Sequence, residues 1–254
     1  MKILAIGDVV GLKSADYLSE KLRAYQRKNE IDFTIVNGEN SAKHNGIDPY
    51  SADIIFEAGA DVITTGNHVY RIPVFNDYLD TNRFVLRPAN YPSACAGRGY
   101  GIYDCGFKRI LVINALGQIN TDTVNSPFDT IDAILEKEKG NYHIAVLDLH
   151  AESTSEKAAV ARYFDGRIQV IFGTHTHVQT NDARILPLGS GFITDLGMCG
   201  PVESILGVES KIIIDRLRRH VPSRFEFADG DVVANGAVFT LENDRVTSVT
   251  PIQF

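Results

Sequence analysis

The feature that most constrains this chain is a pattern that occurs five times. An apolar run ends abruptly in a short cluster of polar residues. The clusters are Gly7-Asp8, Asn37-Gly38-Glu39-Asn40, Gly66-Asn67-His68, Asp148-Leu149-His150 and Gly173-Thr174-His175-Thr176-His177. In open α/β sheets, ligands bind outside the carboxyl ends of the strands. If each apolar run is a strand, five strands bring their polar ends to one rim, and a glycine beside most clusters keeps the turn tight.

Segments with helical signals separate these runs. Ser14–Asn29 repeats apolar residues on one helical face. Asp48-Pro49 opens a second helix that Gly59 ends, with an N-cap aspartate and proline at the first helical position. Ser126-Pro127 opens a third, and a fourth is expected over Ser155–Phe164. The alternation favours α/β layers with the helices outside.

The last part of the chain changes character. Val232–Leu241 and Arg245–Ile252 flank the polar turn Glu242-Asn243-Asp244, which predicts a β-hairpin. No shift in composition marks a linker, so we expect one domain over residues 1–254.

Composition excludes several classes of protein. With 44% hydrophobic and 22% charged residues the chain is globular in type, and no apolar stretch is long enough to predict a membrane span. The N-terminus is interpreted as a first strand, not a signal peptide. Cys95, Cys105 and Cys199 are scattered, which favours a reducing cytoplasm over a disulfide framework. The net charge of −7 argues against an extended nucleic-acid surface.

The clusters have the chemistry of a metal site. Carboxylates, amide oxygens and imidazoles are mixed ligands that suit two divalent ions, and Asp8 or Glu39 could bridge them. Two divalent ions beside two carboxylates leave a local charge of about +2, which would attract phosphate even on an acidic protein.

Each cluster alone has a simpler interpretation. Gly7-Asp8 could be only a turn, and His150 could be an ordinary core histidine; the pair His175 and His177 is the strongest single element. All five together at strand ends favour a site. His44, His143 and His220 lie outside the clusters and are interpreted as structural or solvated.

The residues resemble the calcineurin-like metallophosphoesterases, and in detail their YmdB branch. The resemblance rests on the five clusters and on Asp148-Leu149-His150-Ala151-Glu152, Thr154-Ser155-Glu156-Lys157, Gly173-Thr174-His175-Thr176-His177-Val178-Gln179-Thr180 and Ile193-Thr194-Asp195-Leu196-Gly197-Met198. It implies a four-layer α-β-β-α sandwich of two mixed sheets flanked by helices. It also implies hydrolysis of 2′,3′-cyclic nucleotides or related small phosphodiesters by a metal-bridging hydroxide.

The resemblance also implies a role for each site residue. Asp8, Asn40 and His177 would bind one metal, Asn67, His150 and His175 the other, and Glu39 would bridge them. His68 would bind no metal and would donate a proton to the leaving oxygen.

Departures from the wider superfamily bear on the metal and the substrate. Val10 stands where many relatives have a metal-binding histidine, and Glu39 replaces a bridging aspartate. The harder donor set favours iron or manganese, with zinc and magnesium as alternatives. Arg71 either touches substrate or is solvated. Tyr100, Tyr103 and Phe107, in and just beyond Gly97–Gly106, are candidates to stack on a base, with packing as the simpler role.

Three other functions fit the same residues. A phosphomonoesterase or nucleotidase would use the same ions, a regulatory or scaffold protein would keep the metals for structure, and RNA cleavage would be limited to short strands by the acidic charge. We also expect a homo-oligomer, because α/β domains of this size commonly associate.

Overall fold

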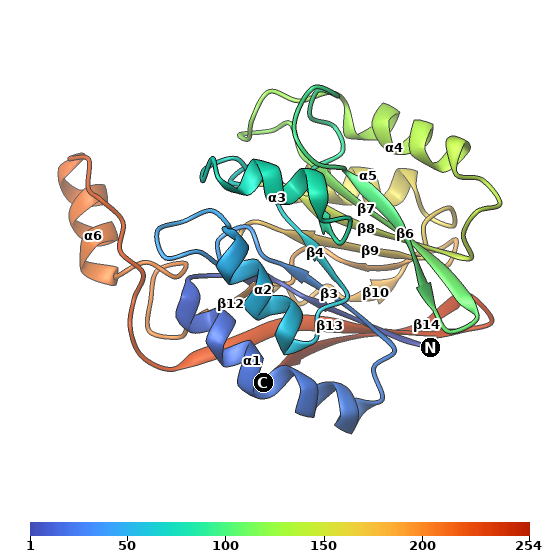
Figure 1. Ribbon diagram of the computed structural model, residues 1–254, viewed down its shortest axis with the longest axis horizontal. Helices are drawn as coiled ribbons and strands as arrows, with labels where there is room; N and C mark the ends of the chain where they lie inside the picture. Colours follow the sequence, from blue (N-terminus) through green and yellow to red (C-terminus); the bar gives the residue numbers. More distant parts are fainter.

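The computed structural model describes residues 1–254 and has two β-sheets packed face to face, with helices on both outer surfaces (Figure 1). This is the predicted four-layer arrangement of two mixed sheets. No helix has both the length and the apolar character needed to cross a bilayer.

The first sheet has a parallel centre and an antiparallel hairpin. Its parallel strands are β1 (Lys2–Ile6), β3 (Phe33–Asn37), β4 (Val62–Thr64) and β5 (Val85–Leu86). The hairpin is β13 (Val232–Glu242) and β14 (Arg245–Gln253), and β13 runs antiparallel to β1. β12 (Met198–Pro201) pairs with β13 just beyond β1, and β2 (Asp8–Val9) pairs with β12. The predicted hairpin is therefore confirmed, and it forms part of the sheet.

In the sequence, the strands of the second sheet come after β5 and before β12. Its parallel strands are β7 (Lys108–Leu116), β8 (Ile144–His150), β9 (Val170–Thr174) and β11 (Gly191–Ile193). β6 (Tyr100–Cys105) and β10 (Arg184–Ile185) are its antiparallel edges.

Five helices cover the outer faces. α1 (Leu12–Asn29), α2 (Pro49–Ala58) and α3 (Phe75–Thr81) pack on the first sheet, and α4 (Pro127–Lys137) and α5 (Thr154–Tyr163) pack on the second. The predicted caps are confirmed. Asp48 accepts a hydrogen bond from the Ser51 N–H at 2.7 Å, and Gly59 ends α2 with φ 117°.

The sixth helix, α6 (Ser210–Arg219), projects from the body (Figure 1). None of its residues is buried. It was not anticipated from the sequence.

Strand alternation places the hydrophobic core in three layers. In β1, Ile3 faces the other sheet whereas Leu4 faces α1 and α2. In β7, Val112 faces the first sheet whereas Leu111 faces α4 and α5. Because successive side chains of a strand point to opposite faces, each sheet is buried on both sides, and its strands are continuously apolar.

Candidate active site

All eight candidate residues lie together where the strands of the two sheets end. β2 and the ends of β3 and β4 belong to the first sheet, and β8 and β9 belong to the second. Asn37 joins the sheets beneath the site, since its side-chain amide donates to Asp148 Oδ2 at 3.1 Å and to Thr174 Oγ1 at 3.3 Å. The site therefore lies at the seam between the sheets.

Glu39, His150 and His175 form a tight group of potential metal ligands. His150 Nε2 lies 3.2 Å from Glu39 Oε1 and 3.0 Å from His175 Nδ1, and the ligand atoms of all three lie within 4.8 Å of one another. Ligand atoms about 2.1 Å from a shared ion are roughly 3 Å apart when they subtend a right angle. The observed spacing fits a shared ion.

Polar contacts on the outer side of each imidazole indicate which nitrogen faces the site. His150 Nδ1 lies 2.9 Å from Thr174 Oγ1, His175 Nε2 lies 3.0 Å from Glu152 Oε2, and His177 Nδ1 lies 3.0 Å from the Leu206 carbonyl oxygen. The Nδ1–H groups of His150 and His177 donate to these oxygens, and His175 Nε2 faces the Glu152 carboxylate as a close polar contact. The inner nitrogen then keeps its lone pair, as a metal ligand requires.

A buried network fixes the orientation of Thr174. Its hydroxyl donates to Asp148 Oδ1 at 2.7 Å, so its oxygen is free to accept from His150. Thr64 donates to the other carboxylate oxygen of Asp148 at 2.5 Å. Burial raises the pKa of Asp148 to about 7, although these hydrogen bonds oppose the rise. The network therefore holds the proton of His150 on Nδ1 and leaves Nε2 facing the site.

Two oxygens at the site lack the partner that burial demands. Asp8 Oδ2 accepts from the His175 N–H at 3.0 Å, but Asp8 Oδ1 has no hydrogen-bond partner and lies 3.7 Å from His177 Nε2. Asn67 Oδ1 is also buried without a partner. A buried acceptor left unpaired costs about 1–3 kcal/mol, so both oxygens fit the coordination of a cation.

The protonation states agree with that fit. Burial lowers the pKa of His150 to about 4, and it does the same for His175. Both imidazoles are therefore neutral at pH 7 and can offer lone pairs. Burial raises the pKa of the Asp8 carboxyl, with His177 and His150 opposing the shift. A nearby cation would favour the carboxylate, as any opposite charge does.

His68 lies beside this group and is positioned by Glu39 and Asn40. Its backbone N–H donates to Glu39 Oε2 at 3.2 Å, and its Nδ1 lies 2.8 Å from Asn40 Oδ1. Burial lowers the pKa of His68 to about 4, against the opposing effect of Glu39. His68 lines the cavity without joining the group formed by Glu39, His150 and His175.

The amide of Asn40 is oriented differently from the sequence expectation. Its nitrogen donates to Glu39 Oε1 at 3.0 Å and lies 3.5 Å from His177 Nε2, whereas its oxygen faces His68. The expected metal ligand was the oxygen. Turning the amide over exchanges two groups of nearly the same shape, so the oxygen would then face His177 and the nitrogen His68.

The loop that carries His175 and His177 is held in an unusual backbone conformation. Both residues have positive φ, 101° and 63°, where side chains other than glycine are uncommon. The Thr176 N–H donates to Asp195 Oδ2 at 3.1 Å, and Lys157 Nζ lies 2.6 Å from the same oxygen in a fully buried ion pair. The sequence analysis gave Lys157 and Asp195 no role. Their position in the motifs that carry the family resemblance could have pointed to them.

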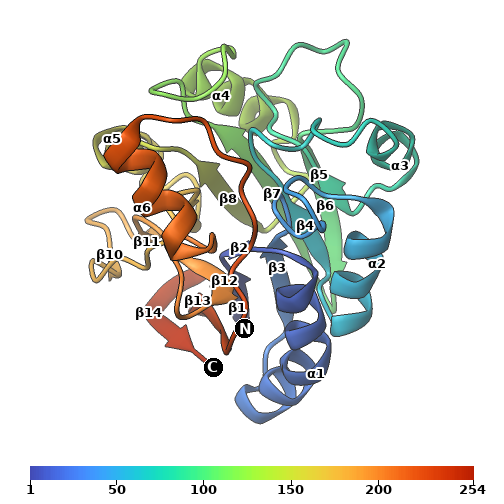
Figure 2. The same cartoon turned by 90° about the vertical axis from the view of Figure 1, so that its left-hand side faces the viewer.

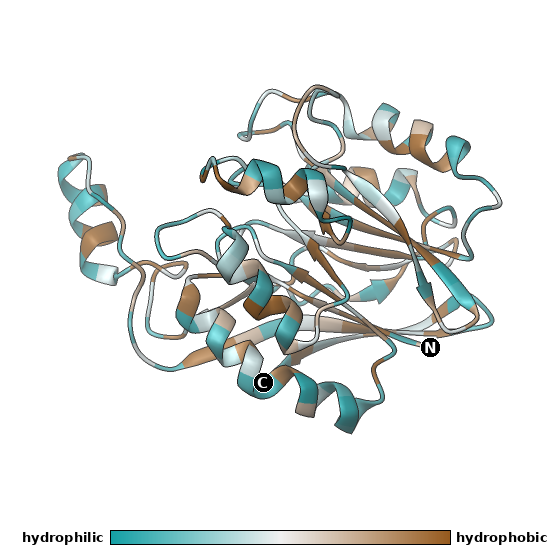
Figure 3. Ribbon diagram, viewed as in Figure 1, coloured by the Kyte–Doolittle hydropathy of each residue, from teal (hydrophilic) through white to brown (hydrophobic).

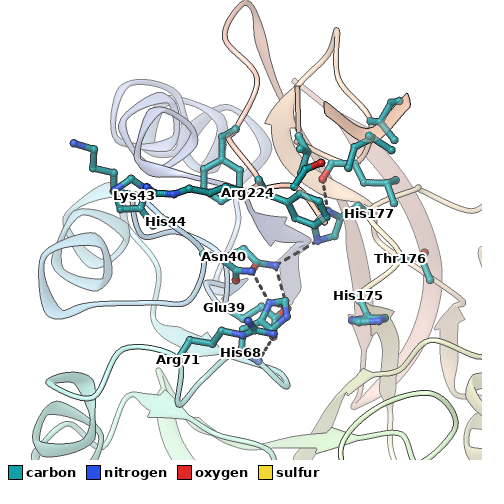
Figure 4. A pocket seen from close by; sticks show the side chains of 18 of the residues that line it. Glu39, Asn40, Lys43, His44, His68, Arg71, His175, Thr176, His177 and Arg224 are labelled. Carbon is teal, nitrogen blue, oxygen red and sulfur yellow. Dashed lines mark hydrogen bonds and ion pairs between the residues drawn. The ribbon is translucent and has the colours of Figure 1, made fainter. Parts of the chain in front are cut away.

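The site opens into a cavity of about 630 Å³. Figure 4 shows Lys43, His44 and Arg224 on the wall opposite His175, with Arg71 beside His68. Apolar side chains complete the lining: Ile205, Leu206, Val208, Ile213, Phe225 and Phe227.

The expected stacking residues lie elsewhere. Tyr100, Tyr103 and Phe107 do not line the cavity. Tyr103 is buried in β6 and donates to the Arg83 carbonyl, and Phe107 is fully exposed at the turn after β6. Gly97–Gly106 is therefore largely an edge strand away from the cavity, so the stacking alternative finds no support, and the packing role holds for Tyr103.

The three histidines outside the clusters differ in surroundings. His143 is structural, because its Nδ1 accepts from the Arg109 N–H at 3.0 Å. His220 is exposed at the end of α6. His44 is exposed but lines the cavity, which was not expected.

Comparison with known proteins finds a matching family and similar structures over nearly the whole chain. A family model described as YmdB-like protein matches residues 4–252. The 2′,3′-cyclic-nucleotide 2′-phosphodiesterase of Bacillus subtilis (strain 168) is 38% identical, over 98% of this chain and 94% of the relative. A phosphatase structure from Mycoplasma pneumoniae is 31% identical with a TM-score of 0.92, covering 100% of this chain and 93% of that one. A hypothetical protein of Thermus thermophilus is 34% identical with a TM-score of 0.95, covering 100% and 99%.

Proposed function

The chain belongs to the YmdB-like family, and from that premise we propose that it is a metal-dependent phosphodiesterase acting on 2′,3′-cyclic nucleotides or related small phosphodiesters. The observation that carries the proposal is the convergence of neutral imidazole lone pairs and unpartnered buried oxygens beside His68, at the floor of an open cavity. Such a site suits a phosphodiester, whose charge is neutralised by cations and whose leaving oxygen takes up a proton.

We propose that the ligands divide between two divalent ions as the family resemblance implies. Asp8, Asn40 and His177 would hold one, Asn67, His150 and His175 the other, and Glu39 would be shared. The short distances among Glu39, His150 and His175 support the second set, and the free Asp8 Oδ1 supports the first. The oxygen-rich donors favour iron or manganese.

Bound divalent ions would neutralise phosphate charge and lower the pKa of a coordinated water. The chain's own residues would do the rest. His68 would donate a proton to the departing oxygen, because it lines the cavity and is not one of the ligands. By the name of the Bacillus subtilis relative, that oxygen is the ribose 2′ oxygen, and the product would be a 3′-phosphate.

Asn40 would decide which nitrogen of His68 carries the proton. With the amide oxygen toward the metal ligands, the amide N–H would donate to His68 Nδ1, which lies 2.8 Å from the amide group. A neutral His68 would then carry its proton on Nε2, and the low pKa of this residue would not prevent proton donation.

The first experiment compares 2′,3′-cyclic AMP, bis(p-nitrophenyl) phosphate and p-nitrophenyl phosphate, with Mn²⁺, Fe²⁺ or chelator. We expect chelator-sensitive cleavage of the diesters and little cleavage of the monoester. A preference for the monoester would instead favour a phosphatase, as the Mycoplasma pneumoniae structure is named. No turnover by folded, metal-loaded protein would refute both and favour a regulatory role.

Two variants test the proton donor. His68→Ala should keep its metal and lose about 10²–10⁴-fold in turnover of 2′,3′-cyclic AMP. Asn40→Asp keeps an oxygen ligand but cannot donate to His68 Nδ1, so it should resemble His68→Ala on this substrate. Both should lose less on bis(p-nitrophenyl) phosphate, whose leaving group needs little protonation. Equal losses on the two substrates would contradict a proton-donor role.

We include a cytoplasmic location in the proposal. It rests on the three cysteines, which are all free thiols. A reducing compartment keeps such thiols unpaired.

A further inference from the structure

Three cationic side chains line the cavity without a carboxylate partner. Lys43, Arg71 and Arg224 are all lining residues, and none of them takes part in any of the protein's ion pairs. We call these three residues the basic wall. Positive charges gathered unpaired around a concave site attract anions.

The charge of the cavity is divided between its sides. The acidic lining residues, Glu39 and Glu152, contact the imidazoles of His150 and His175. In Figure 4, Lys43 and Arg224 lie opposite His175, whereas Arg71 lies beside His68. The protein as a whole carries a net charge of −7, so this local excess of positive charge runs against its overall balance.

The size of the cavity leaves room for a ligand larger than a cyclic phosphate alone. Its volume of about 630 Å³ lies in the range of sites for whole small molecules. In a nucleotide, a group on the 5′ oxygen lies across the ribose from the 2′,3′ edge. A cyclic phosphate at the metal-binding residues would therefore leave a 5′ substituent on another part of the lining.

We propose that the basic wall binds a second phosphate group, esterified to the 5′ oxygen of the ribose whose 2′,3′-cyclic phosphate is cleaved. This inference rests on the proposed function. The second phosphate is either a terminal 5′-phosphate or the internucleotide phosphate at the 3′ end of a short RNA. Arginine is suited to the task because its planar guanidinium binds phosphate oxygens in pairs.

The apolar side of the cavity has room for the base. Phe225 and Phe227 line it, and Arg216 lies over the Phe225 ring at 4.8 Å from its centroid. Stacking on an aromatic ring tolerates any base, so the second phosphate would contribute more to selection than the identity of the base.

The test compares kcat/KM for three substrates with the manganese-loaded enzyme. They are 2′,3′-cyclic AMP, the same nucleotide with a 5′-phosphate, and the dinucleotide ApA ending in a 2′,3′-cyclic phosphate. We expect about a tenfold preference for at least one phosphorylated substrate at low salt, weakening as salt screens the exposed charges. The dinucleotide distinguishes an internucleotide phosphate from a terminal one.

Variants connect the preference to the basic wall. Arg71→Gln, Lys43→Gln and Arg224→Gln should each reduce the ratio of kcat/KM between phosphorylated and bare substrate. Arg218→Gln is the matched control, because Arg218 is an exposed cation of α6 that does not line the cavity. Equal kcat/KM for all three substrates, with normal turnover of 2′,3′-cyclic AMP, would overturn the inference and leave the proposed function intact.

A binding measurement decides the inference without turnover. By titration calorimetry, adenosine 3′,5′-bisphosphate should bind the manganese-loaded protein about tenfold more tightly than adenosine 3′-phosphate. Arg71→Gln should lose most of that difference, and Arg218→Gln should keep it. If no substrate is turned over, the proposed function fails, and equal affinity for the two ligands would separately refute the second phosphate site.

Discussion

The two sides of the cavity are built differently. The floor consists of side chains at strand ends, where Asp8, Glu39 and His150 are at most 1% exposed. The outer wall, residues 202–228, contains α6, which has no buried residue, and is joined internally by the isolated bridges Ile205↔Val208 and Val208↔Phe227. Figure 2 shows this segment crossing one end of the sheets, and Figure 3 shows apolar residues on the projecting helix.

The difference separates two tasks. Rigid strand ends can hold ligand atoms at fixed distances, which metal binding demands. A wall whose helix buries no residue can adapt its shape to substrates, and loops on a rigid scaffold commonly carry specificity. The two meet where His177 Nδ1 donates to the Leu206 carbonyl at 3.0 Å. Changes in the floor should therefore affect metal binding, and changes in the wall should affect substrate choice.

The largest effect should come from Glu39→Gln. Glu39 contacts His150, Asn40 and the His68 N–H, and its carboxylate is 1% exposed. Even a residue one step behind a ligand is worth about 10–100-fold in metal affinity. We therefore expect Glu39→Gln to lose more than about 100-fold, measured by metal titration.

Glu152→Gln is the matched comparison for Glu39→Gln. Glu152 also contacts a site imidazole, since it lies 3.0 Å from His175, but its side chain is 49% exposed. Water can replace this contact, so the loss of metal affinity should be much smaller. Equal losses for the two variants would contradict the expectation that burial of the carboxylate sets its contribution to metal binding.

Thr174→Val should have an intermediate effect. It removes the acceptor for His150 Nδ1–H and one donor to Asp148 while nearly conserving volume. We expect a loss of about 10–100-fold in metal affinity, with kcat of the fully loaded enzyme changed less. Thr81→Val is the control, because the Thr81 hydroxyl bonds only backbone carbonyls and the residue is exposed at the end of α3. An unchanged affinity in Thr174→Val would show that the tautomer of His150 is fixed in another way.

The smallest effect should come from Leu217→Ala in the outer wall. Leu217 is 70% exposed, so the free energy of unfolding should change by less than about 0.5 kcal/mol. Leu18→Ala truncates the same side chain where it is fully buried in α1, and should cost about 2–5 kcal/mol. Chemical denaturation measures both. A cost for Leu217→Ala as large as that for Leu18→Ala would show that the wall is packed against something in solution.

The floor could be predicted from the sequence because its signals are local. A metal-capable residue directly after an apolar run is placed by the strand that precedes it, as with His150 at the end of β8. The same alternation favoured α/β layers with helices outside, whereas the four-layer sandwich of two mixed sheets followed from the resemblance. The resemblance supplied the assignment of ligands to two ions, which spacing alone could not.

The outer wall could not be predicted, because nothing local connects it to the site. Phe225 and Arg224 reach the cavity from a segment far along the chain from the clusters, and α6 buries no face that periodicity could indicate. The orientation of the Asn40 amide depends on contacts with Glu39, His177 and His68, of which only Glu39 is near it in sequence. The ion pair of Lys157 and Asp195 likewise joins two distant elements.

The strand order of the first sheet has a consequence for how the protein is made. Asp8 is held by β2, which pairs with β12, and β12 pairs with β13, which also borders β1. A ribosome delivers Asp8 early, but it delivers β13 only after both sheets' other strands except β14. Until then β1 is paired with β3 on one side only, and its other edge is unpaired. An unpaired strand edge can pair with the wrong strand. We therefore expect the complete ligand set to assemble late, when β12 and β13 have been synthesised and can hold β2 in place.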